Sequence, residues 1–212
     1  MFTGIIQEIG RVADSVRSGG NRRVTIVAKN TAPLLKPGSS IAVNGACLTA
    51  VDCHGDRFTT EIVEESLRKT ALETQIERKL VNLELPLRAD GLVDGHLVLG
   101  HVDSTGTISS IEERGGSWWF SVKVPEELLK FIVHTGSIAI DGVSLTVAEL
   151  TGDLCRISII PQTMKHTIFG QYRVSARVNI EVDVIGKYVE RLMGRGSPRT
   201  SPTIDSLRKQ GF

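Results

Sequence analysis

The sequence has too few cysteines to build a disulfide framework. It contains three, which is an odd number, and no two of them form a Cys-x-x-Cys pair. Disulfide-dense folds carry an even set of cysteines, and a reducing compartment keeps thiols free. We therefore expect free thiols and a cytoplasmic protein.

Long apolar runs and an excess of charge of one sign are also missing. No run of about 18 apolar residues occurs, and the amino terminus lacks a charged segment followed by an apolar one, so we expect neither a membrane span nor a secretory signal. The 25 basic and 24 acidic residues are interspersed and give a formal net charge of +1. This balance offers no electrostatic reason to expect nucleic acid or an anionic membrane as a partner.

The signatures of common cofactor and catalytic sites are absent as well. The sequence has no P-loop, no G-x-G-x-x-G dinucleotide fingerprint and no G-x-S-x-G nucleophile elbow. No cysteine or carboxylate stands at ligand spacing from a histidine, so we expect no metal site.

What the sequence does have is an internal repeat. The stretch Val43–Val51 recurs 97 residues later as Ile140–Ala148, and Val81–Glu84 recurs at the same offset as Val178–Glu181. Two copies of similar length indicate a tandem domain duplication, because a solenoid needs three or more repeats.

Each copy contains a hairpin signal. Asn44-Gly45 and Asp141-Gly142 follow apolar runs, and such dipeptides favour a two-residue turn because both positions need positive φ. The strand after each turn alternates, so its apolar face is expected to join the core. Its other face is polar and carries Cys47 and Thr49 in the first copy, and Ser144 and Thr146 in the second.

The rest of each copy is built of short alternating segments separated by turn residues. Brief helical turns are expected at Leu34–Lys36 and at Pro125–Lys130, the second with its proline at the first helical position. We predict an all-β fold of two tandem six-stranded antiparallel Greek-key β-barrels with short helices, plus a C-terminal helix. The predicted domains are residues 1–97, residues 98–186, and a C-terminal helix and tail over 187–212. Ile185, Val189 and Leu192 form an apolar stripe suited to packing against a helix of another subunit.

The two polar faces differ at one position, where the first copy has Cys47 and the second has Ser144. A thiol and a hydroxyl have similar size but different acidity, so the two sites can play different roles. The alternative is that Cys47 is a small buried hydrophobe and Ser144 a satisfied core hydroxyl.

His101 begins the second copy at the position that Ile5 occupies in the first. A histidine beside a glycine at a strand start can titrate near neutral pH and shuttle a proton, and the alternative is a hydrogen-bonded structural histidine. His96 lies five residues earlier, so on a continuous strand its side chain would face the other way. Solvated side chains are expected for the remaining histidines, His54, His134 and His166.

In combination, these residues resemble riboflavin synthase of the α-chain type. The resemblance covers the chain to about Met193. It is carried by Met1–Ile5, Asn44–Thr49, Gly100–Asp103, Asp141–Thr146 and the repeated Val-Asn-Leu-Glu and Val-Asn-Ile-Glu stretches.

The resemblance implies an enzyme with two lumazine-binding barrels per chain, no metal or organic cofactor, and a homotrimer whose C-terminal helices associate. The implied reaction is the dismutation of two molecules of 6,7-dimethyl-8-ribityllumazine. One molecule donates a four-carbon unit to the other, which gives riboflavin and 5-amino-6-ribitylaminouracil. In such a trimer the first barrel of one subunit faces the second barrel of its neighbour. The resemblance leaves open which barrel holds the donor and whether the protein associates with lumazine synthase.

The resemblance also implies site residues. Those near the reacting centre are His101 as proton shuttle, Ser144 or Cys47 as activator of the nucleophile, and Thr146. The implied substrate contacts are Phe2, Thr3, Gly4, Ile5, Ile6, Cys47, Leu48, Thr49, Glu61, Ile62, Val63, Glu64, Glu65, Ser66, Gly100, His101, Val102, Thr135, Ser144, Leu145, Thr146, Ser158, Ile159, Ile160, Pro161, Gln162 and Thr163. Two of these depart from the family pattern, because Thr135 stands where some members carry a lysine and Ser66 where a threonine is frequent.

Two other functions fit the same fold. A lumazine- or flavin-binding antenna-type protein would hold a fluorescent ligand without converting it, and a structural two-barrel module would bind none. The presence of Phe2-Thr3, Cys47, His101 and Ser144 together favours the enzyme.

Overall fold

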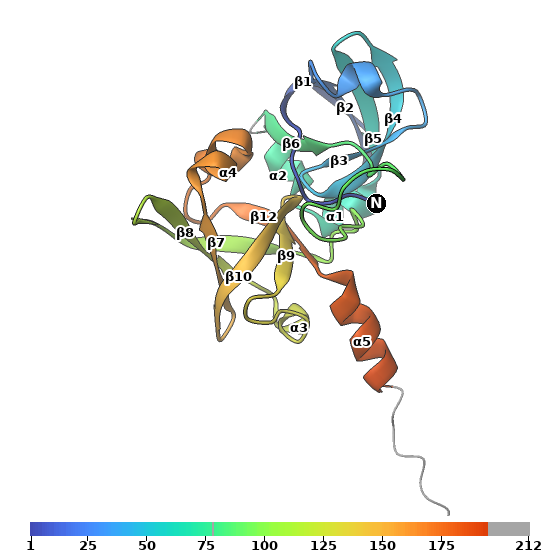
Figure 1. Cartoon of the computed structure of the whole chain (residues 1–212). Helices are drawn as coiled ribbons and strands as arrows, with labels where there is room; N and C mark the ends of the chain where they lie inside the picture. The colour runs from blue at the N-terminus through green and yellow to red at the C-terminus, as the bar shows by residue number, and fades with distance from the viewer. Residues whose placement is uncertain (78, 195–212) are drawn as a thin grey trace, which may run out of the picture.

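Short strands with alternating buried and exposed residues form two barrels in the computed structural model, which describes residues 1–77 and 79–194 (Figure 1). The first barrel contains β1 (Glu8–Ser18), β2 (Asn21–Val27), β3 (Ser40–Val43), β4 (Ala46–His54), β5 (Arg57–Ile62) and β6 (Leu80–Glu84). The second contains β7 (Ser104–Arg114), β8 (Ser117–Lys123), β9 (Ser137–Ile140), β10 (Val143–Thr151), β11 (Leu154–Ile159) and β12 (Arg177–Val182).

Both barrels are closed and antiparallel, with the same strand order. The first runs β1-β2-β5-β4-β3-β6, and the second repeats this order with β7 to β12. Closure leaves no free sheet edge, and the crossing connections are those of a Greek key. The predicted all-β class, the two six-stranded barrels and the C-terminal helix are therefore confirmed.

The helices are short and lie between strands, except for the last one. They are η1 (Ala32–Leu34), α1 (Glu64–Lys69), α2 (Leu72–Glu77), α3 (Glu126–Leu129), α4 (Pro161–His166), η2 (Ile168–Gln171) and α5 (Val184–Gly194). Figure 1 shows α5 projecting away from both barrels. Two details of the prediction were wrong: the first helical turn lies at Ala32–Leu34, and Pro125 is the N-cap of α3 instead of its first residue.

The strands of the barrels lie within the predicted domains of residues 1–97 and 98–186, whose boundaries stay predictions. Helix α5 begins at Val184, three residues before the predicted start of the C-terminal segment. The predicted tail beyond residue 194 lies outside the described residues. Within residues 1–77 and 79–194, no helix has the length and apolar character that crossing a bilayer requires.

Each barrel has its own apolar core. Phe58 and Ile26 fill the first, whereas in the second Phe120 contacts Phe169 edge to face with ring centroids 5.2 Å apart. Each such fully buried side chain contributes about 1.5–3 kcal/mol relative to an exposed one. Apolar contacts also link the barrels, because Ile6, Ile9 and Leu80 of the first copy pack against the core of the second.

The two repeated hairpin turns also join the barrels. Asn44 and Gly45 have φ of 46° and 77°, and Asp141 and Gly142 have φ of 45° and 78°, as the two-residue turns require. The turns touch across the junction, because a Cβ on Gly45 would lie 2.6 Å from the Gly142 nitrogen. The glycines thus serve both the turn and the close approach of two backbones.

A buried hydrogen-bond network surrounds the turns. The Asn44 Oδ1 accepts the backbone N–H of Asn82 at 2.6 Å, and the Asp141 Oδ1 accepts that of Asn179 at 2.7 Å. The two asparagines then donate across the junction, Asn82 to the Asp141 carbonyl at 3.0 Å and Asn179 to the Asn44 carbonyl at 2.8 Å. Gln75 bridges both turns, accepting from Asn44 at 3.0 Å and donating to Asp141 at 2.7 Å.

This junction predicts a large cost for a single methyl group. Gly45→Ala combines a positive φ with a backbone clash, so we expect a loss of about 2–4 kcal/mol in the free energy of unfolding. Gly55→Ala is the matched control: its φ is 57°, but nothing lies within 4 Å of the added Cβ. That variant should lose only about 1 kcal/mol, from backbone strain alone. Urea unfolding of both variants measures the difference, and equal losses would contradict the account.

Candidate functional site

Two segments that precede the barrels cross between them. The first lead segment is residues 2–7, before β1, and the second is residues 98–103, before β7. They pair in antiparallel fashion, with Phe2 N–H donating to the Val98 carbonyl at 2.7 Å and Val98 N–H to the Phe2 carbonyl at 3.1 Å. Each lead segment is thereby held between the barrels.

Each lead segment then contacts the repeated strand of the opposite barrel. The Gly4 carbonyl accepts the N–H of Ser144 on β10 at 2.8 Å, and the Gly100 carbonyl accepts the N–H of Cys47 on β4 at 2.8 Å. The contact is tight, since a Cβ on either glycine would lie 2.6 Å from the Cβ of its partner. The structure therefore contains two related half-sites, one at Cys47 and one at Ser144, and each combines elements of both barrels.

Buried glutamates fix the lead segments. Glu84 accepts the Thr3 N–H at 2.7 Å, the Thr3 hydroxyl at 2.8 Å and the Gly4 N–H at 3.0 Å. Glu181, its counterpart in the repeat, accepts the Leu99 N–H at 2.6 Å and the Gly100 N–H at 3.0 Å. The glutamates of the two Val-Asn-x-Glu stretches thus anchor the half-sites.

Burial changes the acidity of both carboxyl groups. Desolvation raises the pKa of Glu84, and the hydrogen bonds from Thr3 and Gly4 offset part of the rise. Desolvation raises the pKa of Glu181 to about 7, although its bond from Leu99 and the charge of Lys187 act in the opposite direction. Glu181 therefore titrates near neutral pH.

The Cys47 half-site is mainly apolar. The thiol is free and half-buried, and it packs against a buried cluster of Phe2, Ala42, Val98 and Ala139. Gly100 of the second lead segment contacts Cys47, and the side chain of the next residue, His101, is exposed. Cys47 therefore packs against an apolar cluster and is still partly exposed.

The Ser144 half-site contains a histidine that sequence reasoning did not assign. The Nδ1 atom of the His96 ring lies 2.7 Å from the Ser144 Oγ. The backbone N–H of His96 donates to the Thr3 carbonyl at 3.1 Å. Its Nε2 is buried and has no hydrogen-bond partner among the described residues. Burial lowers the pKa of His96, while the negative charge of Asp183 raises it. A neutral imidazole beside a hydroxyl can take up a proton at neutral pH.

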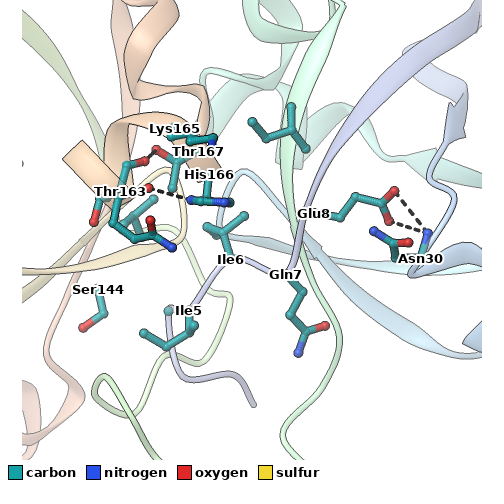
Figure 2. Close-up of a pocket in the computed structure, with 14 residues that line it drawn as sticks. Ile5, Ile6, Gln7, Glu8, Asn30, Ser144, Thr163, Lys165, His166 and Thr167 are labelled. Carbon is teal, nitrogen blue, oxygen red and sulfur yellow. Dashed lines mark hydrogen bonds between the residues drawn. The ribbon is translucent and has the colours of Figure 1, made fainter. Parts of the chain in front are cut away.

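A cleft adjoins Ser144, as Figure 2 shows. Its volume is about 550 Å³, within the range of small-molecule sites. Thr163, Lys165 and His166 of the α4 region line one side, and Glu8 and Asn30 line the other. Six of the expected substrate contacts gather in this cleft: Gly4, Ile5, Ile6, Ser144, Gln162 and Thr163.

The other expected contacts differ in how far their side chains are exposed. The side chains of Leu48, Ile62 and Ile159 are buried in the barrel cores, and that of Phe2 lies between the barrels. Glu61 pairs with Arg23 at 3.5 Å, and Glu65 pairs with Lys69 at 2.8 Å, on the exposed surface. The remaining expected contacts, Thr49, Val63, Glu64, Ser66, Leu145, Ser158, Ile160 and Pro161, are partly or fully exposed.

Thr146 and Thr135 also lie outside the cleft. Thr146 is exposed on the polar face of β10, two residues from Ser144. Thr135 is exposed, has a φ of 61°, and donates its hydroxyl to the His134 carbonyl at 2.6 Å. Their roles, and that of His101, stay predictions. Among the described residues, no group of three or more His, Cys, Asp or Glu side chains could hold a metal ion.

The acidity of Glu181 predicts the pH dependence of stability. Its pKa of about 7 lies above the ordinary 4.5, so the unfolded chain loses its proton first as the pH rises. Glu181 should therefore reduce the free energy of unfolding by about 3 kcal/mol between pH 4.5 and 7, at about 1.4 kcal/mol per pKa unit. Glu181→Gln should flatten this slope, which urea unfolding across that pH range measures. Identical slopes for the variant and the wild type would contradict the assignment.

A family model described as a lumazine-binding domain matches residues 3–86 and again residues 99–183. The riboflavin synthases of Actinobacillus pleuropneumoniae and Bacillus subtilis are 38% and 40% identical to this chain over 215 residues, and both matches cover the full length of both chains.

Solved structures agree with these matches. LumP complexed with 6,7-dimethyl-8-(1'-D-ribityl) lumazine has a TM-score of 0.77 at 25% identity, and LumP complexed with riboflavin has 0.79 at 26%. Each match covers 86% of this chain and 99% of LumP. The chain therefore belongs to the riboflavin synthase family and carries its two lumazine-binding domains.

Proposed function

We propose that this protein is an enzyme that converts two molecules of 6,7-dimethyl-8-ribityllumazine into riboflavin and 5-amino-6-ribitylaminouracil. The observation that carries the proposal is the pair of half-sites at Cys47 and Ser144, which the repeat relates to each other, within two lumazine-binding domains of one chain. Full-length relatives are named riboflavin synthase. LumP, which has the same fold, was solved in one structure with the lumazine and in another with riboflavin. Two like binding domains suit a reaction between two like molecules.

The chemistry suits such a site. The atoms of two substrate molecules equal those of the two products, so the transfer of a four-carbon unit needs no added oxidant or reductant. Conjugation acidifies the 7-methyl group of the lumazine, so a base of modest strength suffices to remove its proton. Holding two heterocycles in position removes much of the entropic barrier of a bimolecular step.

Ser144 and His96 are the proposed acid–base pair. Their 2.7 Å contact and the lowered pKa of His96 leave a neutral imidazole to accept the proton of the group that adds to C7 of the acceptor. Cys47 occupies the matching place in the other half-site, so the serine–cysteine difference divides the two roles. His101, an exposed residue that follows Gly100 in the chain, remains the proposed proton shuttle of that half-site.

The proposed assembly is a homotrimer held by α5. Ile185, Val189 and Leu192 are 61%, 47% and 70% exposed on this helix, at a spacing that suits a helix–helix seam. In this assembly the first barrel of one subunit faces the second barrel of the next, so that donor and acceptor meet. Cytoplasmic location stays a prediction from the cysteine usage, and association with lumazine synthase stays an open question of the family resemblance.

The proposed reaction can be tested by turnover of the pure protein. The pure protein, without added cofactor, should convert dimethylribityllumazine into riboflavin, followed by absorbance and product chromatography. Ser144→Ala and His96→Gln should each lower kcat by about 100-fold, because acid–base catalysis contributes on that order. Ser110→Ala is the control, since Ser110 donates to Ser121 elsewhere on the second barrel. Binding without conversion by the wild type would instead identify an antenna-type protein.

A second prediction concerns assembly. Leu192→Asp places a charge on an exposed part of α5, so it should break the trimer into monomers without unfolding the barrels. We expect light scattering to show a third of the wild-type mass and kcat to fall by about 100-fold. The far-ultraviolet circular dichroism should be unchanged. A fully active monomer would refute the site between subunits.

A further inference from the structure

The second lead segment is tied at both ends to one short stretch, residues 181–187. At its start, Glu181 accepts the N–H groups of Leu99 and Gly100 at 2.6 and 3.0 Å. At its end, Asp103 Oδ2 accepts the Val182 N–H at 3.0 Å, and Asp103 Oδ1 accepts the Lys187 Nζ at 2.7 Å. Because Lys187 lies on α5, the helix is bonded directly to the lead segment.

The tied segment reaches the first barrel. The Gly100 carbonyl accepts the Cys47 N–H at 2.8 Å, and Val102 packs against the core of the first barrel. His101 lies between these two contacts with an exposed side chain. A chain of contacts thus leads from α5 through Asp103 to His101 and the Cys47 half-site.

The Lys187–Asp103 ion pair belongs to the second copy of the repeat, and a neutral hydrogen bond takes its place in the first. There Gln7 occupies the place of Asp103, and its Oε1 accepts the Leu85 N–H at 3.1 Å. The residue 97 positions before Lys187 is Asp90, which pairs with Arg88 at 2.9 Å on the connector. In both copies the side chain of Gln7 or Asp103 accepts an N–H at the end of the last strand, from Leu85 after β6 or from Val182 in β12. In the second copy, Asp103 also forms an ion pair with a helix residue, Lys187.

The Lys187–Asp103 ion pair is more buried than the other ion pair of α5. The two side chains are 28% and 21% exposed, far less than the Lys130–Glu190 pair, which also reaches α5 but is 55% and 47% exposed. Half-buried pairs are less screened by solvent than exposed ones, whose contribution is small. Asp103 also holds the Val182 N–H, so losing Lys187 would leave this carboxylate without its countercharge.

We propose that Lys187 is a positioning residue: through Asp103, helix α5 fixes the second lead segment, and with it His101, above the Cys47 half-site. This inference rests on the proposed function for its effect on turnover. Since α5 also carries the apolar face proposed for assembly, the order of the Cys47 half-site is linked to the helix on which the subunits meet.

The kinetic test compares two lysine substitutions on α5 contacts. Lys187→Met should lower kcat by about tenfold and change KM less, by about threefold at most, because most of the expected substrate contacts lie outside the misplaced segment. Lys187→Arg should restore kcat to within about twofold by keeping the charge. Lys130→Met removes the exposed α5 pair and should leave kcat unchanged. Equal effects of the two methionine variants would overturn the proposal.

A double mutant tests whether Lys187 acts through the lead segment. In a His101→Ala background, Lys187→Met should cause little further loss of kcat, because both changes remove the same positioned group. Losses that multiply would overturn the proposal. So would a Lys187→Met protein of reduced oligomeric mass, since Lys187 would then act on assembly.

A measurement without substrate separates this inference from the proposed function. Amide hydrogen exchange at Leu99 and Gly100 should be about threefold or more faster in Lys187→Met than in the wild type, and unchanged in Lys130→Met. Unchanged exchange in Lys187→Met would overturn the proposal even in an active enzyme. A wild type that forms no riboflavin would refute the proposed function, while this exchange result would still decide the role of Lys187.

Discussion

The buried contact between two hairpin turns is the constraint on which the rest of the structure depends. Gly45 and Gly142 bring two backbones together, and Asn82 and Asn179 donate across the junction. These groups are buried, so each lost partner would cost about 1–3 kcal/mol of desolvation without compensation. The network therefore fixes how the barrels sit, and the lead segments can cross between them only in that arrangement.

Given that arrangement, the two copies have diverged at a few positions that set their chemistry. Cys47 in the first copy corresponds to Ser144 in the second, and Gln7 corresponds to Asp103. The Ser144 half-site has a buried histidine at 2.7 Å, whereas the Cys47 half-site has an exposed histidine on a segment tied to α5. A symmetric scaffold thus presents two unequal sites, as a reaction between unlike partners, donor and acceptor, requires.

The sequence predicted the scaffold because its signals are local. The Asn-Gly and Asp-Gly turns and the alternation after them follow from backbone sterics, and the repeat shows the duplication directly. The sequence does not reveal the His96–Ser144 contact, because a continuous strand from residue 96 to 101 would turn His96 away, whereas the chain here crosses between the barrels. Glu84 and Glu181 were visible as a repeated Val-Asn-x-Glu stretch, yet their role depends on segments that return from about 80 residues away, beyond any periodic pattern.

The number of ligands bound per chain tests the central claim most directly. A lumazine analogue that lacks the acidic 7-methyl group cannot act as donor, so its binding can be measured at equilibrium by calorimetry. Two equivalent domains with unequal half-sites predict two molecules per chain, with different affinities, and Ser144→Ala should weaken only one of them. A single molecule per chain, or two sites that respond equally to Ser144→Ala, would contradict the account.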